Sequence, residues 1–163
     1  APLALGEWNL KSSKLTYEVT HKLKKFKGTS TSARGKASCE KSECQLVFGV
    51  PISSFDSGDG SRDLHVLEAS GGAVHKIASA TAAFDSDFQG VIKIKKMAVI
   101  FAGFTKEIKD LEFKIREKSQ SKIVIQGVFP LKITDFGLER PTFLTMLVQD
   151  DVPVSIEMVW VKK

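Results

Sequence analysis

Residues 127–163 read GVFPLKITDFGLERPTFLTMLVQDDVPVSIEMVWVKK, and they decide the fold class. In the last part of this stretch, every second residue is large and apolar: Val152, Val154, Ile156, Met158 and Trp160. A period of two predicts a strand with one buried face. Residues 139–147, which precede this strand, are expected to form a short helix. Such a helix is too short to be a core helix, but it could cover the end of a sheet that curls on itself.

The rest of the chain continues the β pattern. Strands are expected at residues 15–21, 45–52, 79–84, 91–94, 97–104, 108–116 and 122–133, with a weaker one within 28–38. A second short helix is expected at 61–70, because Ser61 is a candidate N-cap and two glycines follow the segment. Many short, evenly spaced strands with little helix predict a sandwich or a barrel. No repeat or linker interrupts the pattern, so we expect one domain over residues 1–163.

The composition is that of a soluble globular protein, with 42% hydrophobic and 26% charged residues in 163. Eleven Phe against one Tyr and two Trp favour a dry interior, either an ordinary core or an oily cavity. The net charge of +5 indicates either a solvated basic surface or attraction to anionic lipid headgroups or a phosphate. A nucleic acid partner is not expected, because no helix-turn-helix, zinc-finger or RNP pattern is present.

Two cysteines, Cys39 and Cys44, bracket four residues between two expected strands. A hairpin tip would bring their Cα atoms within bridging distance, so a disulfide is expected, with two free thiols as the alternative. A bridge implies an oxidising compartment. The chain starts at Ala1 without Met, followed by Pro2, which favours a removed signal peptide. A periplasmic or secreted location is therefore expected.

Four ordered segments carry a resemblance to a known family. The first leads from Trp8 into a strand that ends Val19-Thr20-His21, and the second is an acidic turn followed by Arg62-Asp63-Leu64-His65. The third is Gly103-Phe104-Thr105-Lys106, and the fourth runs from Asp135 to Val152. Together they resemble the YceI-like proteins, the polyisoprenoid-binding family with a lipocalin-like barrel. The chain departs from the family pattern at residues 69–74, where a bulky apolar pair is missing, and in its cysteine pair.

The resemblance implies an all-β fold, namely an extended antiparallel lipocalin-like β-barrel with one or two short helices. It also implies that an isoprenoid or other long-chain lipid occupies the barrel. A tunnel of aliphatic and aromatic side chains suits such a chain, because a prenyl tail presents only apolar surface. Strand parity selects the candidate ligand-binding residues: Tyr17, Val19, Phe48, Phe84, Val99, Phe101, Phe113, Ile125, Phe129, Ile156 and Met158.

Catalysis, metal binding and a cofactor are not expected. The three histidines are far apart in the sequence, and no Gly-x-Ser-x-Gly nucleophile elbow is present. Two classes of function remain: a carrier or sequestering protein for a lipid, or a structural or interaction module whose barrel is filled by its own side chains. Transient contact with an anionic membrane surface and a homodimer are left open.

Overall fold

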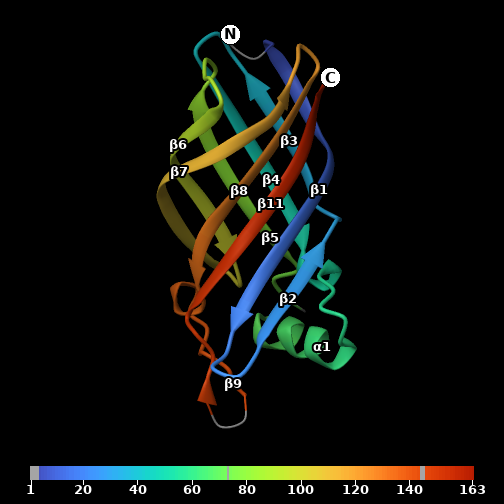
Figure 1. Cartoon of the computed structure of the whole chain (residues 1–163), viewed down its shortest axis with the longest axis vertical. Helices are drawn as coiled ribbons and strands as arrows, with labels where there is room; N and C mark the ends of the chain where they lie inside the picture. The colour runs from blue at the N-terminus through green and yellow to red at the C-terminus, as the bar shows by residue number, and fades with distance from the viewer. Residues whose placement is uncertain (1–3, 73, 144–145) are drawn as a thin grey trace.

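The strands of the chain form a closed antiparallel barrel (Figure 1). The computed structural model describes residues 4–72, 74–143 and 146–163. Eight strands close the barrel in the order β11-β8-β7-β6-β5-β4-β3-β1, and β1 pairs again with β11. The barrel strands and β2 are β1 (Gly6–Thr20), β2 (Lys25–Ser30), β3 (Arg34–Cys39), β4 (Glu43–Pro51), β5 (Ile77–Asp85), β6 (Val91–Phe101), β7 (Phe104–Lys118), β8 (Lys122–Lys132) and β11 (Asp151–Lys162).

Strand β2 shares one edge of β1 with β3. Residues 15–20 of β1 pair with β2, whereas residues 6–9 pair with β3. The two strands thus occupy a single place in the barrel wall, one after the other. The remaining elements are the helix α1 (Gly60–Ala69), the 3-10 turns η1 (Ile52–Ser54) and η2 (Ile133–Phe136), and the short strands β9 (Thr142–Phe143) and β10 (Met146–Leu147).

Strand β11 confirms the alternation that the sequence predicts. Val154, Ile156, Met158 and Trp160 are buried, whereas Ser155 and Glu157 between them are exposed. Side chains of one parity therefore line the interior, and the barrel is the expected all-β, lipocalin-like fold.

The sequence predicts two strands at 91–94 and 97–104, but the structure differs. Residues 91–101 form one continuous strand, β6, and the next strand, β7, begins at Phe104. The polar pair Lys95-Lys96 marks a register shift against β5 rather than a turn. The chain reverses at Ala102 and Gly103, whose φ angles of 53° and 83° suit a two-residue hairpin.

The helix expected at 61–70 is present as α1. The prediction of a helix at 139–147 is wrong. Thr142–Phe143 and Met146–Leu147 form a small antiparallel ladder, and residues 144 and 145 lie outside the described residues. The backbone N–H of Val148 donates to the carbonyl of Pro141 at 3.0 Å, which extends the hairpin. Thr and Phe favour an extended backbone over a helical one, and in this segment they adopt it.

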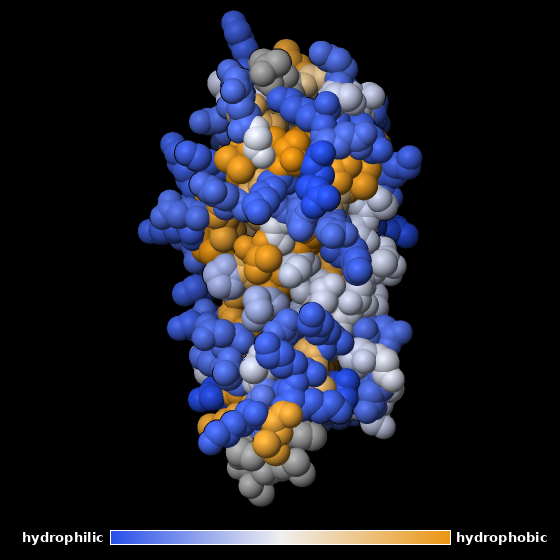
Figure 2. All heavy atoms as spheres, viewed as in Figure 1, coloured by the Kyte–Doolittle hydropathy of each residue, from blue (hydrophilic) through white to orange (hydrophobic). Residues whose placement is uncertain are grey.

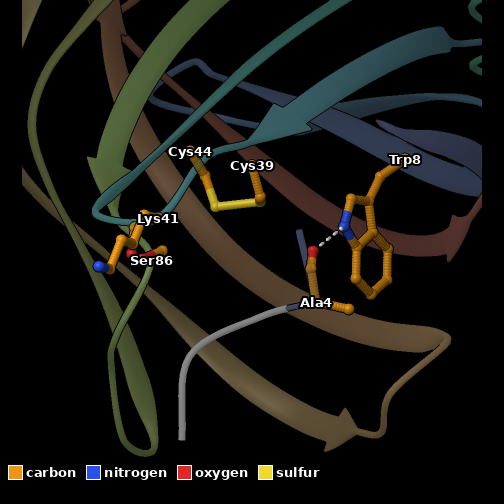
Figure 3. The surroundings of a disulfide bond; sticks show 6 residues. All are labelled: Ala4, Trp8, Cys39, Lys41, Cys44 and Ser86. Carbon is orange, nitrogen blue, oxygen red and sulfur yellow. Dashed lines mark hydrogen bonds between the residues drawn. A yellow bond between two sulfur atoms is a disulfide. The ribbon is translucent and has the colours of Figure 1, made fainter. Parts of the chain in front are cut away.

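The disulfide is present at the barrel end where β1 begins and β11 ends (Figures 1 and 3). Cys39 and Cys44 face each other across β3 and β4, with their Cα atoms 4.1 Å apart. Ser86 donates a hydrogen bond of 3.0 Å to the carbonyl of Lys41, which ties this turn to the β5–β6 connection. Nearby, the Trp8 indole N–H donates to the carbonyl of Ala4 at 3.0 Å.

On the surface, hydrophilic side chains break the apolar ones into separate spots on the face that Figure 2 shows. In the described part of the chain, no helix is both long and apolar enough to cross a membrane.

Candidate lipid-binding cavity

The barrel interior differs between its two ends. In the half next to α1, which we call the α1 half, the inward side chains leave a cavity of about 240 Å³. In the half next to Cys39–Cys44, the disulfide half, a space of about 20 Å³ lies inside the barrel, beside Trp8 and Trp160. A wider hollow of about 580 Å³ at this end includes exposed Lys36, Gln45 and Lys96 in its lining, so it is open to the surface. Inside the barrel, the room for an apolar ligand is therefore in the α1 half.

The cavity has an almost wholly apolar lining. Its walls come from strands far apart in the sequence and from the connections at this end: Leu15, Tyr17 and Val19 of β1; Phe48 and Val50 of β4; Ala78 and Ala80 of β5; Val99 and Phe101 of β6; Phe129 and Leu131 of β8; Val152 and Val154 of β11; and Ile52, Phe55, Phe136 and Leu138. Exposed His65, Lys132 and Glu139 also contribute, so the cavity reaches the surface at this end.

Helix α1 lies across this end of the barrel (Figure 1). None of its residues is buried, although Val66 and Ala69 contribute to the cavity lining. The helix begins where the Asp59 carboxylate accepts hydrogen bonds from the backbone N–H groups of Ser61 and Arg62, at 3.0 and 3.1 Å. Local capping and a few side-chain contacts hold this helix, rather than an apolar face packed into the core.

Two side chains hold the start of α1, one against β2 and one against the connection that precedes the helix. The Arg62 guanidinium stacks over the Phe26 ring of β2, with its carbon 4.1 Å from the ring centroid. Asp63 accepts hydrogen bonds from the backbone N–H and the hydroxyl of Ser57, the latter at 2.6 Å. Both contacts lie at the start of the helix, and at its other end the C-cap residue Ser70 is buried and lines the cavity.

Tyr17 brings a polar atom to the cavity wall. Its hydroxyl is buried and has no hydrogen-bond partner among the residues that the structure describes. Its ring packs against Gly28 of β2 and against the Phe55 ring at 5.4 Å. Burial, and then the nearby Asp63 carboxylate, raise the pKa of Tyr17, so the hydroxyl stays protonated at neutral pH. A Cβ at Gly28 would lie 2.2 Å from this ring, so glycine is required there.

The sequence-derived candidate residues divide between the two halves of the barrel. Six line the cavity: Tyr17, Val19, Phe48, Val99, Phe101 and Phe129. The other five are buried in the core and do not line the cavity: Phe84, Phe113, Ile125, Ile156 and Met158. Contact of any of them with a ligand stays a prediction.

Sequence reasoning missed several residues of the cavity. Leu15, Leu131 and Val154 share the inward parity of residues that were selected, so the strand pattern contained a signal for them. Phe55, Val66, Phe136 and Leu138 come from connections and α1, where no strand period applies. Among the described residues, no cluster of three or more His, Cys, Asp or Glu is placed to hold a metal ion.

The family comparison agrees with this geometry. The model of the YceI-like domain matches residues 8–160. The chain belongs to the YceI-like family. No curated protein matches the chain.

Solved structures share the fold of this YceI-like chain at low sequence identity. Burkholderia cenocepacia BcnA superposes with a TM-score of 0.76 at 15% identity, over 90% of this chain and 95% of its own. A polyisoprenoid-binding domain from Saccharophagus degradans gives 0.74 at 16% identity, over 98% and 99%. The Campylobacter jejuni YCEI protein gives 0.61 at 20% identity, over 73% and 72%. At these identities the likeness establishes the fold alone.

Proposed function

We propose that this YceI-like protein binds an amphipathic lipid and holds its apolar chain, of the isoprenoid class, in the cavity of the α1 half. The observation that carries the proposal is the cavity itself: about 240 Å³, lined by aliphatic and aromatic side chains and open beside α1. Each buried carbon of a ligand contributes up to about 0.8 kcal/mol. The structurally similar Saccharophagus degradans domain, described as polyisoprenoid-binding, supports this choice of ligand class.

Binding and release, rather than catalysis, is the activity we propose. The polar groups at the mouth, His65, Lys132 and Glu139, are exposed and suited to a ligand headgroup. The alternative is a structural or interaction module whose barrel is filled by its own side chains. The interior of the disulfide half is filled in this way, but the interior of the α1 half is not. The disulfide supports a periplasmic or secreted location, because such bonds persist in oxidising compartments.

Contact with an anionic membrane surface is a further part of the proposal. At the tip between β1 and β2, Leu23 is 65% exposed, and exposed Lys22, Lys24 and Lys25 surround it in the sequence. Each lysine near an anionic surface contributes about 1 kcal/mol. Sedimentation with phosphatidylglycerol vesicles should carry down more protein than sedimentation with phosphatidylcholine vesicles. Equal sedimentation with both would count against this contact. The homodimer stays a prediction, for which analytical ultracentrifugation is the test.

The central proposal is tested with geraniol, a soluble ten-carbon prenol, titrated calorimetrically into the protein. Saturable binding with one site per chain is expected. The absence of saturable heat, with a bound ligand excluded beforehand by mass spectrometry, would overturn the proposal.

A further inference from the structure

The cavity ends halfway along the barrel, and the strands show where. On β4 the cavity wall includes Phe48 but not Leu46, which is the next inward residue toward the disulfide half. On β6 it includes Val99 but not Met97. On β11 it includes Val154 but not Ile156. On each of these three strands the cavity lining stops at one inward residue and the next one is buried in the core, so the cavity has a floor.

Five buried side chains form this floor, which we call the packed layer: Leu46, Met97, Phe113, Ile156 and Met158. Met97 has no exposed surface, and Phe113, Ile156 and Met158 are each 1% exposed. All five belong to the buried hydrophobic core of the barrel. The interior at these positions is therefore occupied by side chains.

The packed layer depends on a glycine in the wall. Gly127 of β8 pairs with Ile156 of β11, and an added Cβ at Gly127 would lie 2.3 Å from the Phe113 ring. The ring thus occupies the space that a side chain at 127 would take. In the same manner, Gly35 of β3, which pairs with Phe48, admits the Trp160 ring, since a Cβ there would lie 2.8 Å from it. Two aromatic rings thus pack against glycines of the barrel wall.

The volume of the cavity above this floor limits how many ligand carbons the barrel can hold. A protein cavity of about 150 Å³ holds benzene, which has six carbons. On that scale the 240 Å³ of this cavity holds ~10 carbons. Ten carbons are two isoprene units, and a longer chain has to leave its remainder at the mouth beneath α1.

We infer that the packed layer limits the ligand to a short apolar chain, with about two isoprene units inside the barrel. This inference rests on the proposed function and adds a length limit to it. Carbons beyond the limit remain at the mouth, in contact with water. They therefore contribute little to affinity, because only surface removed from water contributes.

The test is a chain-length series on the wild-type protein, measured as displacement of radiolabelled geraniol. The competitors are prenols of five, ten, fifteen and twenty carbons with the same hydroxyl headgroup. Affinity should rise more than about tenfold from five to ten carbons, and by less than about threefold from fifteen to twenty. A rise from fifteen to twenty carbons as steep as that from five to ten would overturn the length limit but leave the proposed function intact. Failure of geraniol and of every other prenol to bind would overturn both.

A variant of the packed layer adds a second test. Met97→Ala removes a floor side chain next to Val99 and should move the plateau to longer chains, so that the twenty-carbon prenol gains affinity over the fifteen-carbon one. Ile94→Ala is the matched control, because Ile94 is buried on the same strand but farther from the cavity. It should leave the plateau unchanged. If both variants shift the plateau alike, or neither does, the floor is not where we place it. The wild-type series decides the matter even if a variant does not fold.

Discussion

The Phe113 ring on β7 lies directly over Gly127 on β8, so that a Cβ at position 127 would come within 2.3 Å of the ring. Gly127→Ala should therefore displace the ring or the strand and lower the free energy of unfolding by about 1–3 kcal/mol. Denaturant unfolding measures this loss.

The matched control is Gly60→Ala in the first turn of α1. An added Cβ at Gly60 meets no atom within 4 Å, and alanine reduces the freedom of the unfolded chain. This variant should be as stable as the wild type or slightly more so. Equal stability of both variants would contradict the close contact between Phe113 and Gly127.

Val99→Trp tests whether the cavity is free space. Val99 is 5% exposed and lines the cavity, so a larger side chain there should occupy the ligand's volume. Geraniol affinity is expected to fall more than about tenfold, with little loss of melting temperature. A close-packed core would instead be overpacked and lose about 1–3 kcal/mol of stability. Val47→Trp on the outer face of β4, where Val47 is 45% exposed, adds the same bulk outside and should leave binding unchanged.

Phe129→Asp should abolish binding by a different route. The carboxylate would be buried without a partner in the cavity wall, which is costly and repels an apolar chain. Circular dichroism separates the two outcomes, loss of binding in a folded barrel and loss of the fold. A folded variant that binds geraniol as well as the wild type would exclude this wall from the site.

The Cys39–Cys44 bridge should contribute about 2 kcal/mol through the entropy of the unfolded chain, because it closes a short loop. The double variant Cys39→Ala/Cys44→Ala should melt roughly 4–8 °C lower. Addition of a reductant should shift the wild type toward the variant and leave the variant itself unchanged. A wild type that melts at the same temperature with and without full reduction would assign the bridge no stabilising role.

Helix α1 should become less ordered when Asp59 loses its charge. The backbone N–H of Arg62 above all holds the pKa of this carboxyl below its usual range, so the carboxylate stabilises the folded helix. Because the folded-state pKa is the lower one, this stabilisation is present above the ordinary pKa of Asp and is lost as the pH falls through the folded value. Asp59→Ala at pH 7 should therefore reduce hydrogen-exchange protection over residues 60–69 and speed geraniol release.

Glu68→Ala is the control for α1. Glu68 is exposed in the last turn of the helix, where a negative charge opposes the helix dipole. Its removal should leave protection unchanged or increase it. If both variants lower protection equally, the N-cap does not govern how α1 covers the cavity.

The strand pattern predicted a sandwich or a barrel, and the family resemblance selected the barrel. Each buried residue of β11 follows the period of two, whereas a bulge in β1 between Leu10 and Ser12 interrupts it. It did not predict the hairpin at 142–147, because a short run of Thr, Phe and Leu fits a helical turn as well as a strand, and tertiary context decides. The strand pattern alone extended one strand to Phe104 and took Lys95-Lys96 for a break, whereas the resemblance indicated a turn at Gly103–Lys106. The structure reverses the chain at Ala102 and Gly103.

Parity alone also failed to separate cavity from core. Val99 and Met97 share the inward face of β6, but only Val99 lines the cavity. The difference arises from side chains that meet across the barrel, such as Phe113 over Gly127, which no local pattern records. The cavity residues on α1 and on the connections could not be predicted from strand alternation, because they do not lie on strands.

Native mass spectrometry of the protein as purified tests the central claim most directly. We expect a 1:1 complex with a small apolar molecule, which collisional activation releases. Organic extraction should identify this molecule as a lipid with a short apolar chain. Protein with the Val99→Trp substitution, purified in parallel, should carry none. A wild-type protein that shows only the mass of its polypeptide, and that also leaves added geraniol unbound, would contradict the claim that the cavity is a lipid-binding site.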